Sequence, residues 1–375
     1  MIVRQFLEWA RTAPDGARAK AVAALGRAYV LPDLGVQDRA DMDAAFPLIA
    51  VDPSPLVQFE LASALCRHPL VPADLVVKLA ALPGEAGEIV LEQSPVLNTR
   101  ELIEFCTAGT PDRQAAIARR EELPAPIAAV LAESGDIGAC LALVRNPTAD
   151  VPGFALGHIV ARFGTVPELR EALLIRPDLP ADAHHALIRT VAGALSSFVE
   201  ERRWLSPGEA ARVAREACDS ATVAQAGRPH FTDVRALAQA LQARGELTSA
   251  LVLRSLLSGQ MRLFLEAMSI SSGIPVDHVA ALAADRSGDA FRLLYERLGL
   301  PAGAFVAFRT ALQVVQAEAY LDESEEAPGL QQRIIERVIA AYEALPEEAE
   351  NSVLALLRRW QAEARQRRQA ASLAA

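Results

Sequence analysis

Prolines that recur at a nearly constant interval are the strongest constraint on how this 375-residue chain can fold. Between residues 69 and 180, each proline-containing turn follows one apolar helical segment and precedes another. The prolines that mark these turns lie 26, 29, 23 and 30 residues apart: Pro69, Pro95, Pro124, Pro147 and Pro177. A period of ~20–50 residues is typical of helical arrays. One short helix pair cannot bury its own apolar face, so neighbouring pairs must stack into a continuous core.

Helical periodicity and helix-start signals predict helices along the rest of the chain. Apolar residues recur at helical spacing, and alternating runs of strand length do not occur. Small polar residues precede proline at Ser54, Thr110 and Ser206, which favours a helix start. Two positions have the spacing of a capping box, Ser206 with Glu209 and Asn98 with Glu101. The predicted fold is all-α: a HEAT-like α-α superhelix, a solenoid of short helix pairs, with additional C-terminal helices. The alternative is an irregular helical bundle with chance proline spacing.

Changes in pattern predict five segments. Residues 1–48 form N-terminal helices, 49–190 a HEAT-like repeat array, and 191–320 a further helical part of the same domain. Within 181–203 we expect one longer helix with Leu187, Val191, Leu195 and Phe198 on one face. An acidic linker with a Pro-Gly pair follows at 321–330, and two C-terminal helices occupy 331–375.

Composition bounds the kind of partner. The formal net charge is −10, whereas a general nucleic-acid binder needs a strong positive field. The four cysteines lie far apart in apolar helical patterns, which predicts buried free thiols and a reducing cytosol. The N-terminal residues have no apolar signal region, and no apolar stretch approaches the ~18 residues of a membrane span. We therefore expect a cytoplasmic protein.

The sequence contains no recognisable motif for catalysis or for binding a metal or cofactor. The chain has no phosphate-binding loop, nucleophile elbow or zinc motif. The only histidine cluster is His184-His185, and adjacent side chains on a helix point about 100° apart, so they cannot converge on one metal. Paired glutamates are expected at solvated helix ends. The sequence thus predicts no cofactor, no metal and no enzymatic activity.

The best binding candidates are polar residues of the repeat region. Equivalent positions on successive helices of an array line one face, so arginines there form a basic strip that could meet a partner. The candidate partner-binding residues are Arg113, Arg119, Arg120, Arg145 and Asn146. The alternative is ordinary surface arginines, with Asn146 ending its helix in a left-handed conformation before Pro147.

Several blocks resemble known helical repeats. The segment DPSPLVQFELASALCRHPLVPADLVVKLA, residues 52–80, resembles HEAT-like and leucine-rich-variant repeats. Other blocks are similar to a bacterial helical-repeat family known only as a domain of unknown function: SPVL (94–97), AIARR (116–120), MRLFLEAMSISSGIP (261–275) and LLYERLGLPAGAFVAFRTAL (293–312). The resemblance covers roughly residues 45 to 320. It implies a HEAT-like helical fold in a bacterial cytosol and names no catalytic residue.

One departure from the resemblance concerns the contacts between repeats. Many HEAT-type repeats carry a basic residue soon after the Asp-Pro turn, where it ties adjacent repeats together. Here that position is Gln58, which puts the polar ladder between repeats in doubt at that point.

The leading functional hypothesis is a non-catalytic protein-binding scaffold in bacterial signalling or regulation, because arrays offer extended concave surfaces. One alternative is a HEAT-like nucleic-acid-binding protein or DNA glycosylase, which needs a basic channel and exposed aromatic residues. Another is a binder of a small anionic ligand at an arginine cluster or helix N-terminus. We expect the partner to be another protein, with nucleic acid disfavoured by the acidic charge.

Overall fold

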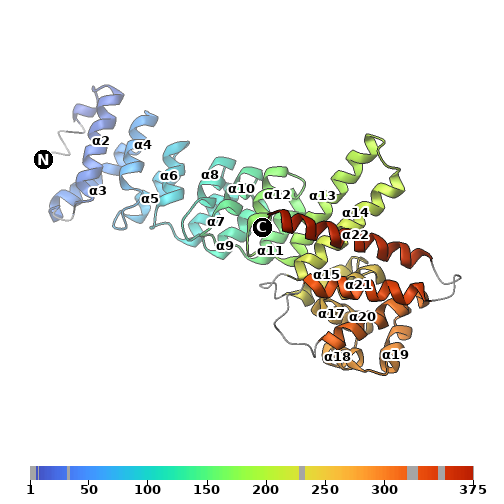
Figure 1. Ribbon diagram of the computed structural model, residues 1–375. Helices are drawn as coiled ribbons and strands as arrows, with labels where there is room; N and C mark the ends of the chain where they lie inside the picture. The colour runs from blue at the N-terminus through green and yellow to red at the C-terminus, as the bar shows by residue number, and fades with distance from the viewer. Residues whose placement is uncertain are drawn as a thin grey trace. The chain divides into compact units, whose positions relative to one another are not determined.

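A computed structural model of the chain describes residues 6, 8–31, 34–227, 233–318, 328–344 and 351–374. Every regular element in these ranges is a helix, which confirms the all-α class (Figure 1). The chain divides into two compact units, Met1–Ala183 and His184–Ala375.

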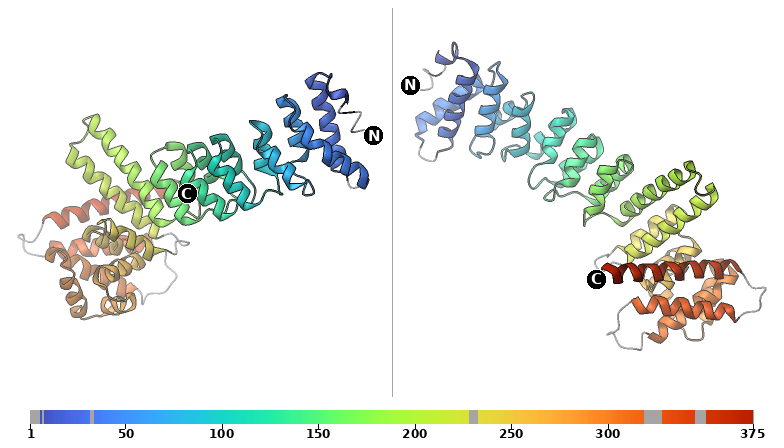
Figure 2. Two further views of the ribbon diagram at one scale, coloured as in Figure 1. Left: turned by 180° about the vertical axis from the view of Figure 1, so that it is seen from behind. Right: turned by 45° about the horizontal axis from the view of Figure 1, so that its top comes forward.

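The first unit contains two rows of short helices. One row stacks in the order α2 (Asp15–Tyr29), α4 (Pro55–Leu65), α6 (Glu85–Gln93), α8 (Pro111–Ala118), α10 (Ile137–Arg145) and α12 (Pro167–Ile175). The other row contains α3 (Val36–Ile49), α5 (Ala73–Ala80), α7 (Thr99–Ala108), α9 (Ala125–Ser134) and α11 (Gly153–Phe163). In the first row each helix packs on the helix two places further along the chain, as the views in Figure 2 also show.

Small side chains let these helices approach closely. A Cβ atom at Gly26 in α2 would lie 2.4 Å from Ala64 Cβ in α4, so only glycine permits this contact. The buried core of the unit consists mainly of alanine, leucine and valine, and its large buried rings are Tyr29 and Phe46. The helices that begin at Pro55, Pro111 and Pro167 carry proline where its missing N–H is not needed.

The predicted helix caps are only partly formed. Both capping boxes are present, Asn98 with Glu101 at α7 and Ser206 with Glu209 at α14. Ser54 and Thr110 precede their helices without a side-chain cap. The buried Ser54 hydroxyl has no hydrogen-bond partner among the residues placed in the structure.

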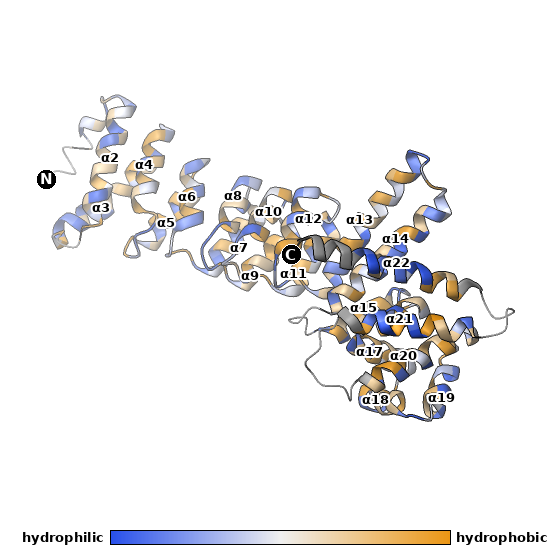
Figure 3. Cartoon of the chain, viewed as in Figure 1, coloured by the Kyte–Doolittle hydropathy of each residue, from blue (hydrophilic) through white to orange (hydrophobic). Residues whose placement is uncertain are grey.

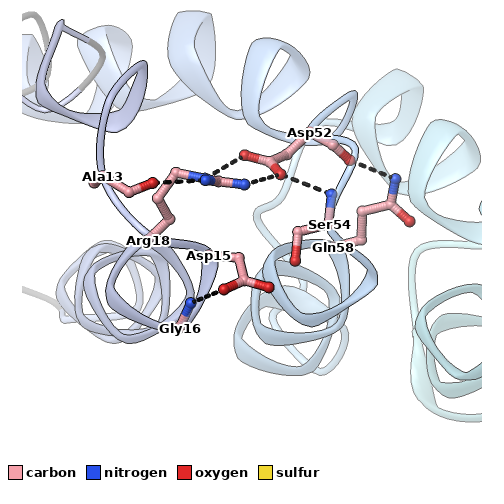
Figure 4. Close-up of polar contacts among 7 residues, drawn as sticks. All are labelled: Ala13, Asp15, Gly16, Arg18, Asp52, Ser54 and Gln58. Atoms are coloured by element: carbon pink, nitrogen blue, oxygen red, sulfur yellow. Dashed lines mark hydrogen bonds and ion pairs between the residues drawn. The ribbon is translucent and has the colours of Figure 1, made fainter.

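At the start of α4 the hydrogen bonds are made by the Asp52 side chain and not by that of Ser54. Its carboxylate accepts hydrogen bonds from Arg18 Nε and Nη2 at 2.9 Å each and from the Ser54 amide at 2.8 Å (Figure 4). Arg18 also donates to the Ala13 carbonyl, and the Gln58 amide donates to the Asp52 carbonyl at 2.8 Å. The Arg18 guanidinium and the Ser54 amide hold the pKa of Asp52 below its ordinary value against the opposing effect of burial. Gln58 therefore makes a local contact within its own turn.

The second unit begins with two long helices, α13 (Ala181–Glu201) and α14 (Pro207–Ala226). They form an antiparallel hairpin whose connected end projects beyond the other helices of this unit (Figures 1 and 2). The remaining helices are α15 (Val234–Ala243), α16 (Ser249–Leu257), α17 (Met261–Ser272), α18 (Val276–Ala284), α19 (Asp289–Arg297), the 3₁₀ turn η1 (Ala302–Ala304), α20 (Phe305–Glu318), α21 (Pro328–Glu343) and α22 (Asn351–Ala374).

Aromatic rings dominate the core of the second unit. Phe264, Phe291, Tyr295 and Phe308 are buried and in mutual contact, with ring centroids 5.3 to 6.4 Å apart. The two C-terminal helices complete this core through Ile334, Val338, Leu357 and Trp360. Of the predicted linker 321–330, residues 321–327 lie outside the described part, and residues 328–330 belong to α21 instead.

Helix α22 is attached to this core by polar contacts as well. The guanidinium of the buried Arg254 in α16 pairs with Glu363 and lies 5.0 Å from the centre of the Trp360 ring. Arg359 pairs with Glu216 of α14 at 3.0 Å. The C-terminal helices are thus an integral layer of the second unit.

Candidate functional site

Two of the predicted partner-binding arginines serve the stacking of the first unit. Arg113 Nη2 donates to the carbonyls of Ala81 and Leu82, at 2.8 and 2.9 Å. Arg120 donates to the carbonyls of Leu91 and Ser94, the latter at 2.6 Å. Burial lowers the pKa of Arg120, which indicates a guanidinium held among main-chain groups and removed from solvent.

The same kind of contact recurs in both rows of helices. The last carbonyls of a helix have no partner within that helix, and a cationic donor is favoured at this end. Here a side chain 26 to 32 residues further along the chain supplies the donor: Arg113 and Arg120 as above, Asn146 to Ala118 and Arg120, Arg162 to Ala132 and Gly135, and Arg176 to Val144 and Asn146. A polar ladder between repeats therefore exists, and it starts from these residues rather than from position 58. We call it the carbonyl ladder.

Asn146 is a buried member of the ladder. Its side-chain amide donates to the carbonyls of Ala118 and Arg120, and its oxygen accepts from Thr148. The expected left-handed conformation is wrong: the backbone has φ −78° and ψ 110°. Pro147 explains the difference, because proline forces the residue before it into an extended conformation.

Three of the five predicted residues do come together. Arg119, Arg145 and Asn146 line a shallow pocket of about 510 Å³ between α6, α8 and α10. Arg119 pairs with Glu92 at 2.9 Å. Arg145 is exposed and makes no hydrogen bond or ion pair with any other residue placed in the structure. Within the predicted set, Arg145 is therefore the residue whose guanidinium faces solvent uncommitted.

An exposed apolar surface on α13 was not identified as a site from the sequence. The face that carries Leu187, Val191, Leu195 and Phe198 indicated packing against a core. Only Leu187 is buried, whereas Leu195 is 60% exposed and its neighbours on the stripe about 40%. In Figure 3 the projecting part of α13 carries hydrophobic (orange) segments. An exposed stripe at helical spacing is the form in which an amphipathic helix meets a partner.

The connected end of the hairpin extends this stripe with aromatic residues. Trp204 is 67% exposed, and its ring stands perpendicular to Phe198 at 5.9 Å. Arg202 lies 5.0 Å above the Phe198 ring. Leu205 and Val213 add further exposed apolar area. We call these residues the hairpin patch: Val191, Leu195, Phe198, Trp204, Leu205 and Val213.

Some of the charged side chains around the hairpin patch have hydrogen-bond partners and others do not. Glu200 accepts from Ser196 at 3.0 Å, and Glu209 belongs to the capping box of α14. Among the described residues, the side chains of Arg203 and Arg212 make no hydrogen bond or ion pair, and the same holds for Glu201. The uncommitted charge that borders the hairpin patch is therefore mainly positive.

Other classes of site find no support in the described residues. All four cysteines are buried, as predicted, and burial raises the pKa of Cys106 to about 12 and that of Cys140 to about 11. These two thiols are therefore not nucleophilic thiolates at neutral pH. No group of three metal-ligating side chains lies together in the part of the chain that the structure covers. Within the same residues, no helix combines the length and apolarity that crossing a bilayer requires.

Sequence comparison places the chain in a bacterial family. The profile of DUF2336, a family of uncharacterised proteins conserved in bacteria, matches residues 87–372. The chain belongs to this family. The match begins later than the expected residue 45 and continues through α21 and α22, which the expected range ending near 320 left out. No curated protein and no solved structure gives a significant match.

Proposed function

We propose that this protein is a non-catalytic protein-binding scaffold, in which a HEAT-like α-α superhelix is followed by a helical unit that docks a partner on the hairpin patch. The observation that carries the proposal is the exposed stripe of Leu195, Phe198 and Trp204 on a projecting hairpin. Isolated exposed apolar residues are ordinary, but a contiguous stripe that ends in aromatic residues marks an interaction surface. Tryptophan and arginine are also the residue types that contribute most to binding energy at interfaces.

The HEAT-like interpretation rests on the repetition of contacts in the first unit. Helices of one row stack on the helix two places along, and each contact of the carbonyl ladder joins residues 26 to 32 positions apart in the chain. Regular stacking of helix pairs with one contact type between neighbours is what defines a solenoid. The shallow pocket beside Arg145 lies on this array and supplies a secondary contact point for the same partner class.

The occupant that we infer for the hairpin patch is an amphipathic helix with acidic flanks, presented by a different protein. A helix laid along α13 would cover the stripe at i, i+4 and i+7. Arg203 and Arg212 beside the patch favour an acidic flank. A second copy of this chain brings the same uncommitted arginines, which disfavours self-association. A bilayer surface would need a clear basic excess, but residues 181–226 carry five arginines against four glutamates and two aspartates.

The test is co-purification from the native bacterial host with matched variants. The full-length protein is compared with Leu195→Glu and Trp204→Glu, each of which places a charge in the hairpin patch. Leu293→Glu is the control, because Leu293 is 71% exposed on α19 and lies away from the patch. We expect one protein to be recovered in fixed ratio with the wild type and the control, and to be lost from both patch variants.

The partner segment is then identified by cross-linking and mass spectrometry. An acidic amphipathic helix at the patch supports the proposal. Equal recovery with all variants contradicts it, as does self-association through the patch or binding to vesicles of anionic lipid. Duplex DNA bound in a salt-dependent manner would favour the nucleic-acid alternative instead.

A further inference from the structure

A pocket of about 440 Å³ lies where the hairpin joins the rest of the second unit. Helix α13 and helix α14 form two of its walls, and the end of α15 with the following loop forms the third. It is distinct from the hairpin patch, which occupies the outer part of the same two helices. Charged and polar groups line it together with small apolar residues.

His185 and Arg189 of α13 form a closed network with Glu246 of the loop after α15, which joins two walls of the pocket. His185 is 4% exposed, and its ring nitrogens lie 2.8 Å from Glu246 Oε2 and 2.8 Å from Thr222 Oγ1. The other oxygen of Glu246 pairs with Arg189. Burial lowers the pKa of His185. The Glu246 carboxylate can only accept, so the His185 Nε2–H donates to it. These groups satisfy one another and hold the two walls in place.

Two further charged groups in the pocket have no such partner. Asp219 and Arg215 lie one turn apart on α14, and neither makes a hydrogen bond or ion pair with a residue placed in the structure. An arginine that precedes an acid by four residues is the less favourable order for pairing along a helix. A carboxylate and a guanidinium are therefore both available to an occupant, side by side.

Small side chains line the pocket on both long helices. Ala192 and Gly193 of α13 and Ala214 of α14 contribute little side-chain volume, and the buried Leu241 of α15 also lines the pocket. A Cβ atom built at Gly193 would meet no atom within 4 Å, which shows free space above this helix position. A short apolar group would fit against these residues.

We propose that this pocket binds a free α-amino acid with an apolar side chain. The ammonium group donates to the Asp219 carboxylate, and the amino-acid carboxylate accepts from the Arg215 guanidinium. The side chain lies against Gly193, Ala214 and Leu241. The two charges of the ligand match the two uncommitted charges of the pocket, and their spacing of one helical turn suits groups borne on a single carbon atom.

Binding depends on the ionisation of Asp219. Burial raises the pKa of this carboxyl to about 6. The ammonium group binds only the ionised form, so affinity falls as pH drops through this value and binding near pH 6 releases protons. The other charged groups that face Asp219 come from three elements besides its own helix: Arg215 and Glu216 on α14, His185 on α13, Glu246 in the loop after α15, and Arg254 on α16.

The experiment is isothermal titration of the full-length protein with L-leucine. Two analogues separate the contacts: N-acetyl-L-leucine lacks the ammonium group, and L-leucinamide lacks the carboxylate. Both should bind about tenfold more weakly or worse, because each leaves a charged group of the protein unpaired. Asp219→Asn should weaken leucine binding by a similar factor and remove the pH dependence. Arg215→Gln should weaken leucine but leave leucinamide unchanged.

A pair of glycine variants tests the position of the ligand. Gly193→Leu places a side chain at a pocket-lining position where a Cβ atom meets nothing within 4 Å, and Gly208→Leu adds the same side chain at another such position of the hairpin, outside the pocket. Leucine binding should be lost in the first and kept in the second, with both melting as the wild type does. The proposal is overturned if L-leucine does not bind at millimolar concentration, if inorganic phosphate binds equally well, or if Gly193→Leu binds leucine normally.

Discussion

The two units of this protein stabilise short helices in different ways. The first unit has a core of small aliphatic side chains, and its neighbouring helices are tied by arginine and asparagine side chains that donate to helix-end carbonyls. The second unit has a core of interlocked rings, to which α21 and α22 contribute from far along the sequence. Each of these contacts in the first unit joins residues 26 to 32 positions apart in the chain. The core of the second unit instead depends on segments that are much further apart in the sequence.

This difference explains where apolar surface is left exposed. In a row of stacked helices each apolar face meets the next helix, and the carbonyl ladder satisfies the helix ends. In the second unit the aromatic core is closed by α20, α21 and α22, and the connected end of the α13–α14 hairpin projects beyond these helices (Figures 1 and 2). The hairpin patch is thus apolar surface that the unit's own fold does not cover.

The largest expected effect comes from the aromatic core. Phe308→Ala removes a fully buried ring that contacts Phe264 and Tyr295, and it should lower the free energy of unfolding by about 3–5 kcal/mol. Urea denaturation followed by circular dichroism should show an early transition from the second unit alone. Leu293→Ala is the control and should shift nothing measurable. If the whole chain unfolds in one earlier transition, the separation of the two units is wrong.

The next effect concerns the carbonyl ladder. Arg120→Ala leaves the carbonyls of Leu91 and Ser94 without their donor, which should cost about 1–3 kcal/mol. Arg145→Ala removes an exposed arginine on the neighbouring helix and should change stability by less than about 0.5 kcal/mol. Hydrogen exchange should accelerate at the end of α6 in the first variant only. Equal effects of the two substitutions would remove the distinction between ladder and surface arginines.

A smaller effect of opposite sign is expected at Asp219. Its folded pKa of about 6 lies above the ordinary value, so the folded state binds the proton more tightly than the unfolded chain does. Stability of the second unit should therefore decrease as pH rises from about 4 to about 6, and Asp219→Asn should stabilise it at neutral pH by about 1 kcal/mol. Thermal melts across this pH range measure both. A variant less stable than the wild type at neutral pH would contradict this explanation.

The smallest stability effect is expected at the hairpin patch itself. Trp204→Ala removes an exposed ring and should alter the free energy of unfolding by less than ~0.5 kcal/mol, although the same substitution should abolish partner recovery. A large loss of stability would mean that Trp204 serves the fold rather than binding. Differential scanning calorimetry of the purified variant makes this distinction.

The sequence predicted the elements better than their roles. Periodicity and capping signals were sufficient for the all-α class, for the capping boxes at Asn98 and Ser206, and for the long helix from Ala181. These signals could not show that Arg120 stabilises the fold whereas Arg145 faces solvent. The difference is that the Arg120 guanidinium donates to carbonyls 26 and 29 residues earlier in the chain. That contact depends on stacking geometry, which no local pattern contains.

The sequence analysis did not identify the hairpin patch or the pocket as candidate sites, and the two reasons are related. Leu187 and Leu195 lie on the same helical stripe, yet one is buried and the other exposed, because an apolar face looks alike whether a core or a partner covers it. Asp219 and Arg215 look like an ordinary surface pair in sequence. In the structure Glu246, from a loop distant in the sequence, pairs with His185 and Arg189. Asp219 and Arg215 line the same pocket without a hydrogen bond or ion pair among the described residues.

The most direct test of the central claim is photo-cross-linking in the native bacterium, with p-benzoylphenylalanine incorporated at position 204 or, as control, at position 293. The proposal predicts one prominent adduct from position 204, joined to an acidic amphipathic helix of another protein and lost when Leu195→Glu is added, with no such adduct from position 293. Absence of a specific adduct at position 204, or an adduct between two copies of this chain, would contradict it.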